Sequence, residues 1–353
     1  MTNTFKSRHL VEPEALEFLE GAARPPLTLT TLPAVREYAR TVFSNRPGQK
    51  HNAIVARELR VAGLNADPDL RVIVFEPTIR PQGRRPAVLH IHGGGYVAGS
   101  IDAEAEWSEW LVNELQCVVI APDYRLSPET SFPGPVHDCY AALRWLHQHA
   151  DEWQIDPARV CVFGGSAGGG LATAVALMAR DRGEHPVSFQ CLLYPMLDDR
   201  TGTGTQANPY AGEYIWTPED NAFAWQCYLA AVEDQARSSP YAAPARAESV
   251  ENLAPTFIWV GALDLFVDEC IEWARRLIRA GVPTELHIQP GVTHGNILLP
   301  DVPSSRICRA TVLDALRRAT AVRSSLHFTP GTAESPASDA ADLMRQKWSR
   351  PGV

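Results

Sequence analysis

Short apolar runs recur along the chain, and stretches with helical periodicity separate most of them. Segments 56–61 and 71–77 alternate between apolar and polar residues, which predicts an antiparallel pair of strands with one solvent-facing side. Six later runs are almost continuously apolar, as expected for strands buried on both faces. They span residues 87–92, 117–124, 159–164, 189–195, 256–263 and 284–289.

Helical patterns lie between or after these runs, at Ala103–Leu115, Val136–His149, Gly169–Arg180, Asp268–Ala280 and about Ser304–Val322. Strands that alternate with helices predict a mostly parallel sheet with helices on both faces. The fold class is therefore α/β. We expect one core over residues 51–322, although a chain of 353 residues is also long enough for two domains.

Three regions depart from the alternation. Residues 1–50 carry a helical patch without a strand, and residues 197–235 form an insertion between two strands. The insertion contains a helix whose start is marked by Thr217 as N-cap, Pro218 in the first turn and Asp220 three residues after the cap. We interpret both regions as a cap over the core. Residues 323–353 are rich in Ser, Thr, Pro and Ala, which predicts a disordered tail.

The end of the run at 159–164 carries the first chemical signal. The sequence GGSAGGG follows this strand and leads into a helix, so Ser166 stands in a G-x-S-x-G pattern at a strand-to-helix turn. Ligands of parallel sheets bind beyond the carboxyl ends of the strands. A strained turn that presents a serine needs small neighbours, and Gly164, Gly165, Ala167 and Gly168 provide them. A phosphate-binding loop is the alternative, but no G-K-[ST] follows.

Three consecutive glycines follow the strand at 87–92, in the sequence HGGG that begins at His92. Acyl transfer passes through a tetrahedral oxyanion, which backbone N–H groups stabilise. We expect Gly94 and Gly95 to offer their N–H groups beside that of Ala167, because a glycine has no Cβ to hold the substrate away. A flexible loop would explain one glycine but not three.

Three segments together resemble the hormone-sensitive-lipase family of bacterial esterases, within the α/β-hydrolase fold. They are HGGGYVAGS, DYRLSPE and GGSAGGGLA, and the resemblance extends from about residue 50 to 322. Two departures stand out. Gly165 replaces the family's aspartate before the nucleophile, and DLFVD, from Asp264 to Asp268, replaces D-P-L-R-D. The resemblance implies an α/β-hydrolase core with a helical cap, a monomer or homodimer, and Tyr124, Arg125 and Glu129 as supports of the HGGG loop.

The remaining catalytic residues are predicted from their positions. The chain order in this fold is Ser, then Asp or Glu, then His. His294 lies in a loop after the last predicted strand, whereas His92 belongs to the HGGG loop and is expected to be structural. Asp264 follows a strand directly, as the residue that orients the imidazole should, while Asp268 looks like a helix-start residue. We predict the triad Ser166, Asp264 and His294.

These residues predict a carboxylesterase that hydrolyses short to medium acyl esters without a metal or other cofactor. Four aromatic residues of the insertion are candidates for the substrate pocket: Trp216, Phe223, Trp225 and Tyr228. Their helical spacing indicates that more of them belong to the core of the cap than to the pocket. An amidase or peptidase with the same triad is the first alternative. A non-catalytic receptor is the second, but receptors that resemble this family lack the histidine that His294 supplies.

Composition excludes several classes of partner. The formal net charge of −9 and the pI near 5.7 argue against nucleic acid and anionic membranes as partners. The first twenty residues carry acidic side chains where a signal peptide would be apolar, so we expect a cytoplasmic protein. The seven cysteines are scattered and mostly set in apolar context, which indicates reduced, buried thiols rather than a disulfide framework or metal site.

Overall fold

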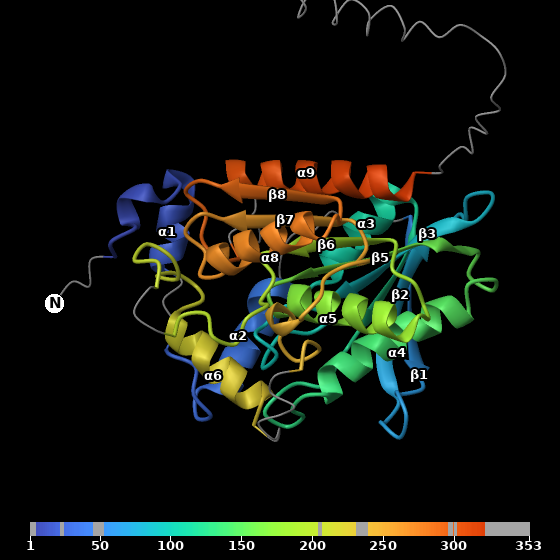
Figure 1. The fold of residues 1–353 in the computed structure, drawn as a ribbon, viewed down its shortest axis with the longest axis horizontal. Helices are drawn as coiled ribbons and strands as arrows, with labels where there is room; N and C mark the ends of the chain where they lie inside the picture. Colours follow the sequence, from blue (N-terminus) through green and yellow to red (C-terminus); the bar gives the residue numbers. More distant parts are fainter. Residues whose placement is uncertain are drawn as a thin grey trace, which may run out of the picture. The chain divides into compact units, whose positions relative to one another are not determined.

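An eight-stranded sheet forms the centre of the molecule in the computed structural model (Figure 1). The structure describes residues 5–21, 25–44, 53–203, 207–230, 239–295, 299 and 302–321. The predicted tail at 323–353 lies outside the described residues. The strands are β1 (Ile54–Val61), β2 (Leu70–Pro77), β3 (Arg85–Ile91), β4 (Val118–Pro122), β5 (Ile155–Gly165), β6 (Phe189–Leu193), β7 (Thr256–Gly261) and β8 (Thr284–Gln289).

The strand order is β1-β2-β4-β3-β5-β6-β7-β8. β2 pairs antiparallel with β1 and with β4, and every other neighbouring pair is parallel. The predicted mostly parallel sheet with an antiparallel pair at its start is therefore confirmed. β2 is buried along nearly its whole length, so the expectation of a solvent-facing side holds for β1 but is wrong for β2. The reason is that β2 is an inner strand and also contacts helices α3 and α4.

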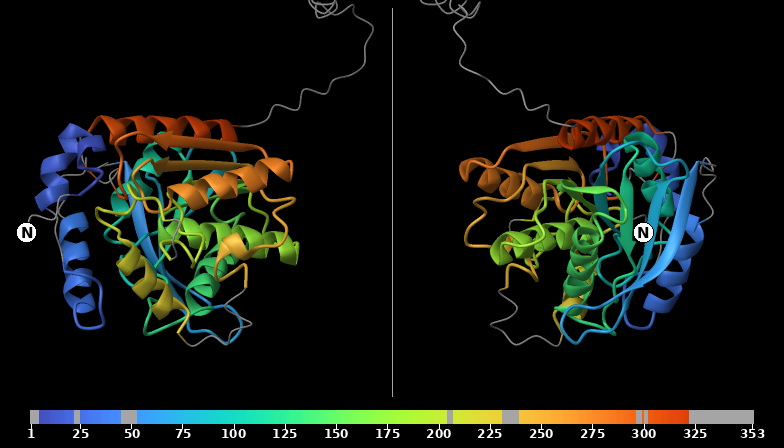
Figure 2. Two further views of the ribbon diagram at one scale, coloured as in Figure 1. Left: turned by 60° about the vertical axis from the view of Figure 1, so that its left-hand side comes forward. Right: turned by 90° about the vertical axis from the view of Figure 1, so that its right-hand side faces the viewer.

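Helices cover both faces of the sheet (Figures 1 and 2). α3 (Ala105–Leu115) and α9 (Pro303–Thr320) contact each other on one face. α4 (Gly134–Gln148), α5 (Ala167–Arg182) and α8 (Val267–Arg279) pack on the other face, with α4 against α5 and α8 against β7 and β8. Two short 3-10 helices, η1 (Arg8–Leu10) and η2 (Pro244–Arg246), complete the connections. The core between these layers is apolar, and β3 and β4 are buried at every position.

Three further helices gather at the end of the sheet toward which β7 and β8 point (Figure 1). They are α1 (Pro13–Gly21) and α2 (Leu32–Ser44) from the N-terminal region, and α6 (Pro218–Tyr228) from the insertion. α6 begins as predicted, because the Thr217 side chain accepts a hydrogen bond of 3.3 Å from the Asp220 N–H. The N-terminal region and the insertion therefore lie over the carboxyl ends of the parallel strands, where ligands of this architecture bind.

Candidate active site

Ser166 stands at a tight turn between β5 and α5, with φ +56° and ψ −124°. A non-glycine residue at positive φ is strained, and its neighbours hold it in place. The Ser166 N–H donates to the Leu193 carbonyl at 2.9 Å, and the Ser166 carbonyl accepts from Met196 at 2.9 Å. Gly168 is required for space, because an added Cβ would overlap the Ile91 carbonyl of β3. The turn therefore places Ser166 at the end of the sheet, where the residue is buried but lines a cavity.

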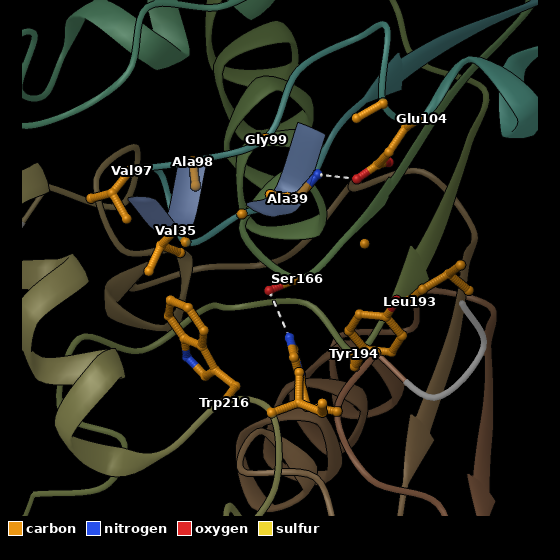
Figure 3. Close-up of a pocket in the computed structure, with 18 of the residues that line it drawn as sticks. Val35, Ala39, Val97, Ala98, Gly99, Glu104, Ser166, Leu193, Tyr194 and Trp216 are labelled. Carbon is orange, nitrogen blue, oxygen red and sulfur yellow. Dashed lines mark hydrogen bonds between the residues drawn. The ribbon is translucent and has the colours of Figure 1, made fainter. Parts of the chain in front are cut away.

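His294 connects Ser166 to Asp264. Its Nε2 atom lies 3.0 Å from Ser166 Oγ, and the dashed line from Ser166 in Figure 3 marks this hydrogen bond. Its Nδ1 atom lies 2.9 Å from Oδ2 and 3.1 Å from Oδ1 of Asp264. Asp264 is fully buried, and its Oδ1 also accepts the Phe266 N–H at 2.9 Å. The structure thus brings the three residues predicted from the sequence into one hydrogen-bonded chain.

The loops that carry Asp264 and His294 are joined through their backbones. Leu263 donates its N–H to the Val292 carbonyl at 2.9 Å, and Ala262 donates to Gln289 at 2.9 Å. The imidazole of His294 is enclosed by the rings of Tyr194 and Phe266, whose centroids are 4.8 and 5.2 Å away. Packing and backbone pairing therefore hold the imidazole in a single orientation, which acid–base chemistry requires.

The HGGG loop passes beside Ser166. Gly94 and Gly95 have φ of +112° and +61°, a region that glycine adopts at little cost. Side chains would also not fit, because a Cβ on Gly94 would overlap the Ala98 carbonyl and one on Gly95 would overlap the Trp216 ring. The Gly93 N–H is already taken by Glu104 Oε1 at 2.9 Å. The N–H groups of Gly94 and Gly95 are therefore the backbone donors that the three glycines have available beside the start of α5.

His92 is embedded in this support, as expected. Its ring stacks on Tyr124 with centroids 4.1 Å apart, and Nδ1 lies 2.8 Å from the Gly93 carbonyl. Burial acts first to lower the pKa of His92, so the imidazole stays neutral near pH 7. The hydroxyl of Tyr124 donates to the His92 carbonyl at 3.0 Å. These contacts hold the first residue of the glycine loop in a fixed position.

Arg125 and Glu129 of the DYRLSPE segment form ion pairs with residues outside the HGGG loop. Arg125 binds both carboxylate oxygens of Asp138 in α4, with a shortest distance of 2.8 Å. Glu129 pairs through both its oxygens with Arg36 of α2, at 2.7 Å each. Arg36 also donates to the Val97 carbonyl at 2.7 Å, just beyond the glycines. Glu129 is therefore connected through Arg36 of α2 to the HGGG loop, whereas Arg125 connects the segment to α4.

A cavity of about 210 Å³ opens at Ser166 and His294 (Figure 3). Its walls are mostly apolar. α1 and α2 contribute Phe18, Leu19, Val35, Tyr38 and Ala39, the glycine loop contributes residues 93–95 and 97–99, and the opposite side contains Ala103, Glu104, Trp107, Phe163, Leu193 and Tyr194. An apolar hollow with a few convergent polar groups is the usual form of a small-molecule site.

Of the four aromatic candidates from the insertion, Trp216 lines this cavity and the other three do not. Trp225 and Tyr228 are buried in the main hydrophobic core, where Tyr228 stacks on Tyr96 of the HGGG loop at 4.1 Å and Trp225 lies 5.2 Å from Tyr96. Phe223 packs against the same core. The pocket roles considered for Phe223, Trp225 and Tyr228 are therefore wrong, because α6 turns its aromatic face toward the core.

Neither the residues of α1 and α2 in the cavity wall nor Glu104 stand in a sequence motif that predicts this position. The helical pattern within residues 1–50 indicated a cap, but it did not show which residues face the serine. The residues around Glu104 do not indicate that it lines the cavity, because its position depends on a hydrogen bond from Gly93, eleven residues earlier in the chain.

All seven cysteines are buried and unpaired, in agreement with their apolar sequence context. Among the described residues, no group of three or more His, Cys, Asp and Glu side chains is arranged to hold a metal ion. Nor does any helix in the described ranges have the length and apolar character needed to cross a membrane. Cytoplasmic location and a monomer or homodimer remain predictions.

Comparison with known proteins agrees with this architecture. Residues 88–298 match the family model described as the alpha/beta hydrolase fold. The chain therefore belongs to the α/β-hydrolase family, in its hormone-sensitive-lipase branch. The chain is a carboxylesterase, since relatives that match most of it are named esterases or, as in Mycobacterium tuberculosis NlhH at 33% identity over 74% of this chain and 82% of that protein, carboxylesterases.

Esterase LipI of Mycobacterium tuberculosis is 32% identical over 305 residues, which cover 84% of this chain and 91% of that protein. A bacterial heroin esterase structure superposes with a TM-score of 0.83 at 37% identity, covering 90% of this chain and 100% of its own. An esterase structure from Pyrobaculum calidifontis gives a TM-score of 0.77 at 30% identity, covering 88% and 100%.

Proposed function

We propose that the protein hydrolyses short to medium acyl esters with Ser166 as nucleophile, His294 as general base and acid, and Asp264 as the residue that orients the imidazole. The observation that carries the proposal is the hydrogen-bonded chain from Ser166 Oγ through His294 to the buried Asp264. Nucleophile, base and orienting carboxylate in hydrogen-bond reach form the arrangement that activates a serine.

The steps follow from this geometry. His294 Nε2 takes the Ser166 proton as Oγ attacks the ester carbonyl, and the carbonyl oxygen becomes an oxyanion. The N–H groups of Gly94, Gly95 and Ala167 stabilise this charge, helped by the N-terminus of α5. The oxyanion collapses, and the alcohol leaves with the proton from His294. His294 then takes a proton from a water molecule that attacks the acyl-enzyme, and it returns this proton to Ser166 Oγ as the Oγ–acyl bond breaks and the acid is released.

The buried carboxylate of Asp264 gives the imidazole two advantages. It accepts the Nδ1–H, so Nε2 carries the lone pair that faces Ser166. It also stabilises the imidazolium that forms during each proton transfer. Because Asp264 is fully buried, this attraction is weakly screened by water.

The preference for short to medium acyl groups rests on the size of the cavity. Its volume of about 210 Å³ is smaller than the ~300–1,000 Å³ typical of pockets for drug-sized ligands. Apolar side chains from the cap and the core enclose it, so it suits a compact acyl group. We expect p-nitrophenyl esters of about C2–C8 to be hydrolysed faster than long-chain triglycerides. Faster hydrolysis of emulsified triolein than of p-nitrophenyl butyrate would contradict this.

Replacement of the nucleophile tests the mechanism directly. Ser166→Ala should lower kcat for p-nitrophenyl butyrate by at least ~10⁴-fold, because no other group supplies the covalent step. The melting temperature should change little, since the hydroxyl adds little to packing. A fluorophosphonate should label the wild type at one residue, identified by peptide mass spectrometry as Ser166. Stoichiometric labelling elsewhere would contradict the assignment, and faster turnover of matched anilides than of esters would indicate an amidase.

A further inference from the structure

One ionisable side chain in the cavity wall has no role in these steps. Glu104 stands directly before α3, and its carboxylate turns back to accept the Gly93 N–H at 2.9 Å. An ideal Cβ on Gly93 would lie 3.6 Å from Glu104 Oε1 and 3.6 Å from Ser166 Cβ. Gly93 therefore lies between the Glu104 carboxylate and Ser166 and is in reach of both. Figure 3 shows both labelled residues around the same hollow.

The surroundings of Glu104 favour its charged form. Burial acts first to raise the pKa of Glu104, but the hydrogen bonds that its carboxylate makes with His90 and with the Gly93 N–H help to outweigh burial, and the pKa lies below its ordinary value. The N-terminus of α3 acts in the same direction, since its partial positive charge stabilises an anion. Glu104 therefore carries a negative charge near pH 7, and its side chain remains 22% exposed.

No permanent cation neutralises this charge within the described residues. The basic side chain within 4 Å of Glu104 is His90, whose Nε2 lies 3.3 Å away, and neither lysine nor arginine comes as close. Among the described residues that line the cavity, Glu104 is the only acidic one, and none is lysine or arginine. The aromatic side chains Trp107, Phe163 and Tyr194 also line this cavity. A carboxylate in the wall of a mostly apolar cavity that also contains aromatic rings attracts an organic cation.

We propose that Glu104 binds a cationic ammonium group of the substrate, so that the enzyme prefers esters with an amine or quaternary ammonium group close to the ester bond. This inference rests on the proposed function, because it places the cation beside Ser166. The short path from Glu104 to Ser166 limits the distance between the cation and the carbonyl to a few bonds. Choline-type esters and short aminoacyl esters meet this condition on the alcohol side and the acyl side, respectively.

Matched pairs of cationic and neutral esters test the proposal. Acetylcholine and 3,3-dimethylbutyl acetate have the same shape and differ in charge on the alcohol side. Methyl 4-(trimethylammonio)butanoate and methyl 5,5-dimethylhexanoate form the corresponding pair on the acyl side. The kcat/KM ratio within each pair is divided by the ratio of the hydroxide-catalysed rates, which removes the difference in intrinsic reactivity. In the wild type, the corrected ratio should favour the cation about tenfold or more in at least one pair.

The variant Glu104→Gln retains an oxygen that can accept the Gly93 N–H but loses the charge. It should lower the cation preference about tenfold. The matched control is Glu106→Gln, which removes the same charge two residues away, from a side chain that pairs with Arg309 and does not line the cavity. The control should leave the ratio unchanged. A ratio that falls equally in both variants would overturn the assignment, because the effect would then be long-range.

Competition experiments in the wild type make the test independent of how well the variant folds. Choline should inhibit hydrolysis of p-nitrophenyl acetate at lower concentration than its neutral isostere 3,3-dimethylbutan-1-ol. Equal inhibition together with corrected ratios near one would overturn the cation site while leaving the esterase mechanism intact. If the wild type hydrolysed neither p-nitrophenyl acetate nor any of the four esters, the proposed function itself would fail.

Discussion

The imidazole of His294 lies 2.9 Å from the carboxylate of Asp264, although the two residues are thirty positions apart in the chain. Asp268, one helical turn later, is exposed in the first turn of α8. Both aspartates belong to the segment DLFVD, so the sequence offers two similar carboxylates. Their surroundings differ completely, because one is fully buried and the other faces solvent.

Exchange of each aspartate for asparagine separates their roles. Asp264→Asn should lower kcat by about 10⁴-fold, because the amide favours the wrong imidazole tautomer and cannot stabilise the imidazolium. Asp268→Asn should change kcat little and cost about 0.3–1 kcal/mol of stability, from its interaction with the helix dipole. The comparison needs kcat and the melting temperature of both variants. A larger fall in kcat for Asp268→Asn would move the acid to the later position.

Two tryptophans of the insertion should behave differently. Trp216 lines the cavity, so Trp216→Ala should enlarge it and raise kcat/KM for p-nitrophenyl octanoate relative to acetate. Trp225 is buried against Tyr96, so Trp225→Ala should lower the free energy of unfolding by about 3–5 kcal/mol. An acyl-chain series and urea denaturation measure the two effects. An unchanged acyl preference in Trp216→Ala would show that this side chain does not limit the acyl group.

Arg36 should affect substrate binding more than stability. It fastens α2 to Glu129 and to the Val97 and Ser127 carbonyls, and α2 supplies cavity residues. Arg36→Met should raise KM for p-nitrophenyl butyrate several-fold and lower the free energy of unfolding by about 1–2 kcal/mol. The control Arg40→Met removes an exposed arginine of the same helix that pairs at 3.6 Å with Glu37. Equal KM values in both variants would exclude a role for the Arg36 contacts.

Glu76 should make stability depend on pH. Its side chain is 2% exposed and binds Arg80 at 2.8 Å and the buried Arg85 at 3.1 Å. Burial alone would raise the pKa of Glu76, but hydrogen bonds from the two arginines hold it below its ordinary value of 4.5. The folded-state pKa is thus depressed, so the stabilisation is fully present above pH 4.5 and is lost as the pH falls through the folded-state value.

Glu76→Gln should therefore lower the free energy of unfolding by about 3 kcal/mol at pH 7, because Arg85 is left without its buried counter-charge. The difference from the wild type should shrink in strongly acidic buffer, where Glu76 itself becomes protonated. Urea denaturation across this pH range gives the curve. Glu58→Gln, from an exposed pair with Arg71, serves as the control and should show a small difference throughout. A constant difference for Glu76→Gln would contradict the linkage.

The sequence by itself determined the architecture and the local form of the reactive loops. Buried strands and helices can be predicted from the spacing of apolar residues, which is a local property of the chain. The turn at Ser166 and the HGGG loop require residues without side chains at fixed positions, so their glycines appear as motifs. The order of Ser166, Asp264 and His294 follows the order in which the strands end. For these reasons the fold and the candidate triad could be predicted.

The tertiary structure decided what lines the cavity and what supports it. Periodicity indicated that α6 has a buried aromatic face, but only packing against Tyr96 showed that Trp225 and Tyr228 belong to the core. The alternating pattern of residues 71–77 likewise did not indicate that β2 would be buried on both faces. Glu104 meets Gly93 through one hydrogen bond between a side chain and the backbone of a separate element. Such contacts depend on how elements are placed in space, and the local pattern of a sequence does not encode that placement.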